Sequence, residues 1–178
     1  MNRLGKKRGT KKRRNHKLRD HPELIPFEYS QITKYLYIGT NLCCQTHFHS
    51  DLIRKGIEAD LCLEDKQMDA PFGAKYFLWL PTKDHAAPSP QQVALGVQFI
   101  DFCVKNKIKV YVHCERGHTR SPMLVAAYLV SVGMSMNEAI ALLRTKRPTT
   151  HLTKSQQIAL KNFSKTLPGM NRSGKHKK

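Results

Sequence analysis

The chain of 178 residues is 40% apolar and 25% charged, so it has the length and the hydrophobic material for one packed domain. This composition excludes wholly disordered, collagen-like and disulfide-scaffold chains. No apolar run approaches the roughly 18 residues that cross a bilayer, and the basic N-terminus lacks the apolar segment of a signal peptide. We therefore expect neither a transmembrane helix nor export.

The cysteine count indicates the compartment. An odd number of cysteines at irregular spacings argues against a disulfide framework and for free thiols in a reducing compartment. We expect a cytoplasmic protein, or a nuclear one if the source is eukaryotic, because the N-terminal run is basic. The cysteines are Cys43, Cys44, Cys62, Cys103 and Cys114.

The net charge of +18 is concentrated at the two ends of the chain. Residues 1–19 contain ten Lys and Arg, residues 169–178 contain four, and neither segment contains an acid. We therefore expect a disordered basic tail (1–24), a folded domain (25–168) and a second basic tail (169–178). Such tails attract nucleic acid or an acidic membrane surface, or serve only solubility or localisation. Because no aromatic side chain interrupts the charges, they do not predict base-specific recognition.

The folded part begins with a predicted hairpin and a predicted helix. Residues 31–39 alternate apolar and polar on both sides of Lys34, which is typical of a short hairpin at a sheet edge. Residues 42–56 place Phe48 and Leu52 at helical spacing and end on a glycine, so they predict one amphipathic helix.

Two buried strands are predicted from the apolar runs at 57–63 and 76–80, and another short apolar strand is predicted at 108–112. A proline-bounded loop, residues 81–88, follows the second of them. Since strands alternate with helices, the sequence predicts an α/β fold: a single domain with a central, mostly parallel sheet of four to five strands flanked by helices.

Four helices are predicted after the second of these strands. Ser89, Ser135 and Thr153 are each followed three residues later by Glu or Gln, a capping box that marks a helix start. These helices extend to about residues 106, 146 and 166, and residues 121–132 form an apolar helix between the first and second of them.

One segment, residues 110–122, carries the chemistry, and it reads V-Y-V-H-C-E-R-G-H-T-R-S-P. A strand leads through a tight turn, eased by Gly117, into a helix N-terminus. Backbone N–H groups in such a turn, together with the helix dipole, bind phosphate. Arg120 adds a planar fork that can hold two phosphoryl oxygens. The remaining phosphate-binding positions of the turn are Glu115, Arg116, Gly117, His118 and Thr119.

Cys114 lies within this positive field, which favours the thiolate form and therefore a nucleophile. For an isolated cysteine, a buried structural role would be the better interpretation. The combined spacing of His113, Cys114, Gly117, Arg120 and Ser121 favours the catalytic one.

The segment resembles the signature of the cysteine-dependent protein phosphatases, H-C-x-x-G-x-x-R followed by Ser or Thr. The continuation R-S-P and an apolar helix is most similar to the small, atypical dual-specificity branch, over residues 32–163. The resemblance implies that Cys114 attacks phosphorus to give a phosphocysteine and that Arg120 steadies the transferred group. It also implies that Ser121 eases departure of the thiolate, that His113 buttresses the loop, and that no cofactor or metal is needed.

The family supplies a general acid from a loop before the long helix, and Asp84 in residues 81–88 occupies that position. Asp65 and Asp69, in another loop after a strand, are the alternatives. His85 either shapes the substrate mouth or is a surface histidine.

The sequence contains two other cysteine patterns of interest. The run C-C-x-x-H-x-H at 43–49 fits no common zinc spacing, lacks a second ligand pair and falls in the predicted helix, so we expect no metal there. Cys62 resembles a strand-end cysteine that in some relatives forms a reversible disulfide with the nucleophile. A buried strand cysteine is an equal alternative.

The main hypothesis is a monomeric phosphatase that hydrolyses phosphotyrosine and phosphoserine or phosphothreonine in proteins. Phosphoinositides or RNA 5′-phosphates are alternative substrates of the same site, suggested by the tails, Arg116 and His118, although Glu115 would repel a highly anionic group. A phospho-binding module without activity and a nucleic-acid-binding protein are alternatives of a different class.

Overall fold

The computed structural model describes residues 26–44, 47–68 and 70–168, so both predicted tails and Asp69 lie outside the described residues. A single five-stranded sheet has the order β1-β2-β5-β3-β4. Only β1 and β2 are antiparallel, and the other three strand pairs are parallel. The predicted α/β fold with a mostly parallel sheet is therefore confirmed. The strands are β1 (Tyr29–Gln31), β2 (Leu36–Gly39), β3 (Ile57–Cys62), β4 (Tyr76–Trp79) and β5 (Lys109–His113).

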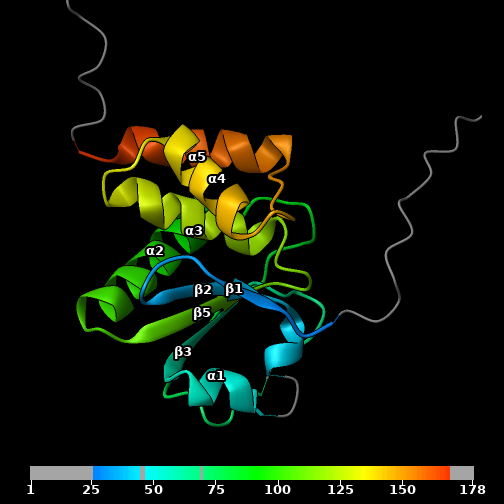
Figure 1. Ribbon diagram of the computed structural model, residues 1–178. Helices are drawn as coiled ribbons and strands as arrows, with labels where there is room; N and C mark the ends of the chain where they lie inside the picture. The colour runs from blue at the N-terminus through cyan, green and yellow to red at the C-terminus, as the bar shows by residue number, and fades with distance from the viewer. Residues whose placement is uncertain (1–25, 45–46, 69, 169–178) are drawn as a thin grey trace, which may run out of the picture.

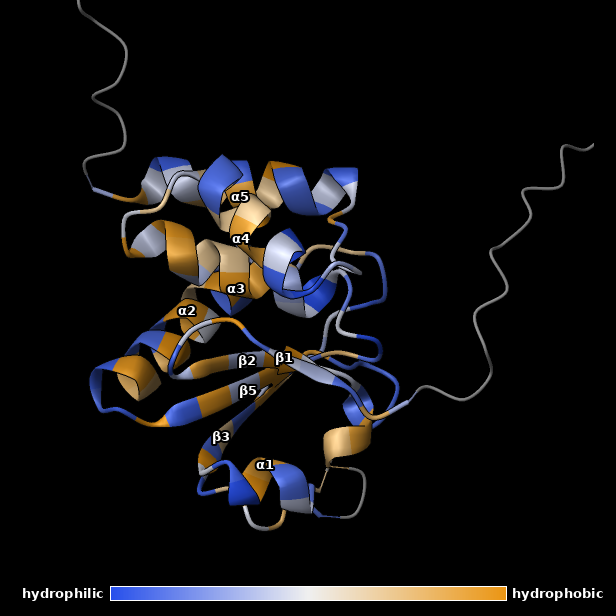
Figure 2. Ribbon diagram, viewed as in Figure 1, coloured by the Kyte–Doolittle hydropathy of each residue, from blue (hydrophilic) through white to orange (hydrophobic). Residues whose placement is uncertain are grey.

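Helices cover both faces of the sheet. In Figure 1, α2 to α5 lie together on one side of the strands, and the short α1 lies on the other side, next to β3. Figure 2 shows hydrophobic residues, in orange, along the strands and on the helix faces between the layers. The helices are α1 (Ser50–Arg54), α2 (Pro90–Lys105), α3 (Arg120–Ser131), α4 (Met136–Lys146) and α5 (Lys154–Thr166).

Helix α3 is the centre of the larger core. It packs against β5 as well as α2, α4 and α5, and its residues 120–130 are all buried. A helix that is apolar all round must be enclosed in this way. Its N-terminus, where Arg120 begins the helix, is therefore held rigidly at the end of β5.

The local helix signals are confirmed where the chain satisfies them by itself. Ser89, Ser135 and Thr153 each accept from the backbone N–H three residues on, and the side chain at that position returns the bond. The predicted hairpin is formed by β1 and β2, with β1 at the sheet edge.

The predicted helix over 42–56 is wrong. The chain forms a short 3₁₀ turn, Asn41–Cys43, and then α1 at Ser50–Arg54. His49 caps α1 by accepting from the Asp51 N–H (3.2 Å), and its own N–H donates to the Cys43 carbonyl (2.6 Å), which reverses the chain between the two pieces. Gly56, with φ of +71°, ends the segment as predicted.

The prediction of a buried strand over 76–80 is also wrong in one respect. β4 is an edge strand bonded only to β3, and Tyr76 and Phe77 are each 38% exposed. An edge strand presents one side to solvent although its sequence is apolar. Within the described residues, none of the helices combines the length and apolarity needed to cross a membrane.

Candidate active site

The loop between β5 and α3, residues 114–119, lies where the carboxyl ends of the parallel strands meet. Its tight bend depends on Gly117, whose φ is +65°. A Cβ atom at this position would lie only 2.5 Å from the Gly39 carbonyl oxygen at the end of β2. Only glycine permits both this conformation and this close approach.

A buried arginine that the sequence analysis missed braces the same loop. Arg147, at the end of α4, donates from Nε to the Gly117 carbonyl (2.8 Å) and from Nη2 to the Arg116 carbonyl (3.0 Å). Its Nη2 also pairs with Glu28 (2.7 Å). The only sequence signal was a basic residue at a helix C-terminus, which the helix dipole favours whatever the function.

Cys114 lies at the floor of a cleft of about 230 Å³ and is 2% exposed. Its Sγ lies 3.4 Å from the Ser121 Oγ, so the hydroxyl is within hydrogen-bond distance of the thiol. The cleft is lined by Lys66, Asp84, His85, Cys114, Glu115, Arg116, His118, Thr119, Arg120 and His151.

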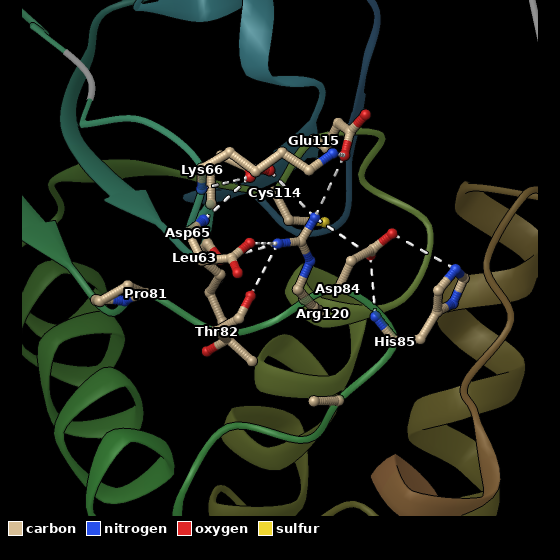
Figure 3. A network of polar contacts seen from close by, with 12 residues as sticks. Leu63, Asp65, Lys66, Pro81, Thr82, Asp84, His85, Cys114, Glu115 and Arg120 are labelled. Atoms are coloured by element: carbon tan, nitrogen blue, oxygen red, sulfur yellow. Dashed lines mark hydrogen bonds and ion pairs between the residues drawn. The ribbon is translucent and has the colours of Figure 1, made fainter.

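The guanidinium of Arg120 lies beside Cys114 and is almost completely buried (Figure 3). Nη1 donates to the carbonyls of Thr82 (2.9 Å) and Leu63 (3.3 Å), and Nη2 donates to the Glu64 carboxylate (3.1 Å). Within the described residues, the buried Nε–H has no acceptor.

Three further carboxylates reach the same guanidinium, and the most distant is Glu115, whose oxygen lies 3.9 Å from Nη2. An oxygen of Asp65 lies 3.2 Å from Nη1, and an oxygen of Asp84 lies 3.2 Å from Nη2. Burial alone would lower the pKa of Arg120, but Cys114, Glu64 and Asp84 raise it above its usual value. The guanidinium therefore keeps its charge in the interior.

The geometry separates the two described candidates for the general acid. Asp84 and Asp65 both contact Arg120, but only Asp84 also lines the cleft with Cys114. The Asp84 carboxylate is 42% exposed and accepts from the His85 N–H (3.0 Å), while the His85 ring lies 3.4 Å from its other oxygen. His85 lies at the mouth, with φ of +60°.

Glu64 is a second site residue that the sequence analysis missed. It is 1% exposed, and its Oε1 accepts from the N–H groups of Asp65 and Lys66, each at 3.0 Å. Its other oxygen is held by Arg120, so this carboxylate fixes the guanidinium from behind. The available signal was its position just beyond β3, because the ends of neighbouring parallel strands meet at one edge.

The negative charge of Glu115 at the cleft is paired with a basic side chain. Its carboxylate accepts from the Lys66 ammonium (2.7 Å), and this bond raises the pKa of Lys66. His118, on the same loop, has its pKa lowered to about 4 by burial and by the nearby Arg147. The ring of His118 is therefore neutral near pH 7.

His113 lies behind the loop, fully buried. Its Nε2 is 3.2 Å from an Asp60 oxygen and 3.4 Å from the Cys44 Sγ. Burial lowers the pKa of His113, but Cys43 and Asp60 together raise it well above its usual value. Cys43 ends a short 3₁₀ turn and Cys44 follows it, so the amphipathic helix predicted there is wrong. Asp60 and His113 form the second pair of ligand-type residues that the sequence analysis did not find.

All five cysteines are buried, and none forms a disulfide. Cys62 lies opposite His113 in the parallel register of β3 and β5, next to the strand end that carries Cys114. Its Sγ accepts from the Glu64 N–H (3.3 Å). A disulfide between Cys62 and Cys114 stays a prediction.

Comparison with known proteins gives one family. A family model described as the catalytic domain of dual specificity phosphatases matches residues 36–166, a range that includes every residue of the cleft. The chain is 34% identical over 75 residues to protein-tyrosine-phosphatase IBR5 of Arabidopsis thaliana, covering 42% of this chain and 29% of that protein. It is 36% identical over 89 residues to phosphatidylglycerophosphatase and protein-tyrosine phosphatase 1 of Homo sapiens, covering 49% and 41%. The chain thus spans less than half of either relative.

Solved structures share the fold. The crystal structure of PTPMT1 in complex with PI(5)P has a TM-score of 0.68 at 24% identity, covering 77% of this chain and 94% of that chain. The crystal structure of Tk-PTP in the active form has a TM-score of 0.69 at 24% identity, covering 78% and 97%. The similarity therefore extends over nearly the whole of the two solved chains and over about three quarters of this one.

Proposed function

Because the chain belongs to the dual specificity phosphatase catalytic domain family and is a phosphatase, we propose that it removes phosphate from tyrosine and from serine or threonine residues of proteins through a phosphocysteine intermediate. One observation carries this proposal: Cys114, Arg120 and Asp84, which come from two different loops and a helix, meet in one cleft.

In the first step the Cys114 thiolate attacks phosphorus, so that an S–P bond forms while the P–O bond to the leaving group breaks. The Arg120 Nε–H and the N–H groups of the loop bind the equatorial oxygens of the transferred group. Arg120 is held ready for this by Glu64 and by the carbonyls of Leu63 and Thr82.

Asp84 protonates the departing oxygen and later takes a proton from the water that attacks the phosphocysteine. The S–P bond then breaks, and the Ser121 hydroxyl, 3.4 Å from the sulfur, stabilises the returning thiolate. The Asp84 carboxylate also pairs with Arg120, and a bound phosphoryl group competes for that contact.

A phospholipid headgroup is the second candidate substrate. Lys66, Arg116 and Arg120 bring positive charge to the cleft, and Lys66 engages the Glu115 carboxylate that would repel a multiply charged headgroup. The human relative has both activities in its name, phosphatidylglycerophosphatase and protein-tyrosine phosphatase.

A substrate panel decides between the two candidates. We expect kcat/KM for phosphotyrosyl and phosphothreonyl peptides to exceed that for phosphatidylglycerophosphate and phosphoinositides in mixed micelles by at least about tenfold, with Cys114→Ser as the blank for each. The opposite order would replace the protein substrate by a phospholipid. Equal rates with Cys114→Ser and the unmodified enzyme would reject the mechanism itself.

A further inference from the structure

A second cluster of potential metal ligands includes His113, and none of its members lines the cleft. Cys43 and Cys44 follow β2, Asp60 lies within β3, and His113 ends β5. All four are fully buried, and one donor atom from each lies within 4.8 Å of all the others. The sheet order places β5 between β2 and β3, which is why residues so far apart in the sequence meet here.

We propose that Cys43, Cys44, Asp60 and His113 bind one zinc ion. The donor set is two sulfurs, one imidazole nitrogen and one carboxylate oxygen, which suits a four-coordinate structural zinc site. Sulfur ligands disfavour magnesium, calcium and manganese, which prefer oxygen. The site is separate from the chemistry at Cys114 and does not depend on the proposed substrate.

Asp60 is the independent observation that points to a cation. Neither of its carboxylate oxygens has a hydrogen-bond partner within the described residues, although the side chain is completely buried in a central strand. One of these oxygens lies 3.2 Å from the His113 Nε2, and the sulfurs of Cys43 and Cys44 lie within 4.8 Å of the carboxylate. A buried carboxylate is costly unless a cation lies against it, and a zinc ion among these donors would supply that charge.

The distances fit tetrahedral coordination after a small adjustment. Bonds of about 2.0–2.3 Å place neighbouring tetrahedral ligands about 3.3–3.8 Å apart. The contacts of His113 with Asp60 (3.2 Å) and with Cys44 (3.4 Å) already approach this range. The two sulfurs are 2.6 Å apart and must separate by about 1 Å, which rotation of either side chain provides.

A bound ion would also position the catalytic loop. His113 directly precedes Cys114, so a bond from its Nε2 to zinc would fix the end of β5 from behind. Asp60, Cys43 and Cys44 would then be positioning residues, because none of them lines the cleft.

The test uses the full chain, reduced and stripped of metal by a chelator. We expect it to bind one equivalent of Zn²⁺ in competition with a chromophoric chelator, and Zn²⁺ to raise its thermal midpoint, since a ligand that binds only the folded state stabilises it. With Co²⁺ as probe, we expect thiolate-to-cobalt charge-transfer absorption and visible bands of tetrahedral intensity. The cobalt spectrum reports the ligands of the unmodified protein, so it does not depend on a variant that folds.

Variants then assign the ligands. Cys44→Ser and Asp60→Asn should each weaken Zn²⁺ binding by at least about tenfold, with the larger loss, about a hundredfold or more, for the cysteine. Cys103→Ser is the matched control, because Cys103 is an equally buried thiol on α2 outside the cluster, and it should bind as the unmodified protein does.

The proposal is overturned if the reduced protein takes up no Zn²⁺ and its cobalt complex shows no charge-transfer band. In that case protonated His113 alone is the cation beside Asp60. Equal losses of binding in Cys103→Ser and Cys44→Ser would also overturn it, as would a Cys43–Cys44 disulfide found by mass spectrometry in protein kept under reducing conditions.

Discussion

Cys114 and the Cys43–Cys44 pair lie at the same end of the sheet but in opposite surroundings. Cys114 opens onto a cleft and has a guanidinium and a hydroxyl beside it. Cys43 and Cys44 have no exposed surface and face Asp60 and His113. Burial raises the pKa of Cys43 well above its usual value. The same residue type is thus set up for nucleophilic attack in one place and for ligation in the other, and the neighbours decide which.

The strongest test of this contrast exchanges sulfur for oxygen on the catalytic side. Cys114→Ser should lower turnover of an aryl phosphate by at least about 10⁴-fold, because an un-ionised hydroxyl is a poor nucleophile. Binding of inorganic phosphate should persist, since the loop N–H groups and Arg120 remain. Phosphate release and calorimetry measure the two effects. Cys103→Ser, with a thiol whose pKa is raised to about 11 by burial, should keep full activity.

Replacing the cation beside Cys114 is the next test in size. Arg120→Lys should lower kcat by about 10²–10³-fold, because one ammonium cannot contact Glu64, two carbonyls and a phosphoryl oxygen together. Arg144→Lys, an exposed position on α4, is the control and should behave as the unmodified enzyme. A loss of less than about threefold in the Arg120 variant would make that residue structural only.

The proposed general acid, Asp84, gives a smaller and more selective effect. Asp84→Asn should lower turnover of phosphotyrosine by about 10–10²-fold but spare phosphocysteine formation from an activated aryl phosphate, whose leaving group departs without a proton. The defect should grow with the pKa of the leaving group in a series of aryl phosphates.

Asp65→Asn is the matched control for this experiment, because Asp65 contacts the same guanidinium but does not line the cleft. It should lower the rates of all substrates by a similar factor. If the leaving-group dependence appears in Asp65→Asn and not in Asp84→Asn, the acid belongs to the other loop.

Much of the fold was predictable because its signals are local. The capping boxes at Ser89, Ser135 and Thr153 form within four residues of chain, and the phosphate loop is one contiguous segment. The helix predicted over 42–56 failed because the His49 N–H donates to the Cys43 carbonyl six residues earlier, a bond that turns the chain and that no helix contains.

The parts of the site that the sequence did not predict depend on strand order. Glu64 reaches Arg120, and Asp60 reaches Cys44, only because β5 lies between β3 and β2 in the sheet. Neither pairing has a fixed sequence spacing. The second pair of ligand residues therefore could not be found within a single segment such as 43–49.

A further test asks whether Cys62 forms a disulfide with oxidised Cys114. Mild peroxide should inactivate the enzyme through Cys114, and if Cys62 traps the oxidised sulfur, a dithiol should restore activity. Cys62→Ser should then reduce the recoverable fraction, whereas Cys103→Ser should not. Mass spectrometry of the oxidised enzyme should find the Cys62–Cys114 peptide. A sulfenic acid without that bridge would make Cys62 a core residue only.

The smallest expected effect concerns His118 in the loop and His113 at the end of β5. These two histidines sharpen the contrast between a buried group with a charged partner and one without. The pKa of His118 is lowered from 6.5 to about 4. Between pH 6.5 and pH 4 this ring is therefore protonated in the unfolded chain but neutral in the folded protein. Stability from this group is therefore present above about pH 6.5 and is lost as the pH falls toward 4. His113, whose pKa is raised, has the opposite dependence.

Comparing a variant with the unmodified protein isolates His118 from His113. Between pH 7 and pH 5, the thermal midpoint of His118→Asn should fall by about 2–4 °C less than that of the unmodified protein, because the half-buried ring is partly screened by solvent and contributes on the order of 1 kcal/mol. His85→Asn is the control, since the His85 side chain is 70% exposed, and its midpoint should follow the unmodified protein. An identical fall in His118→Asn would mean that the ring gains access to water before the protein unfolds, so that it takes up its proton in the folded state.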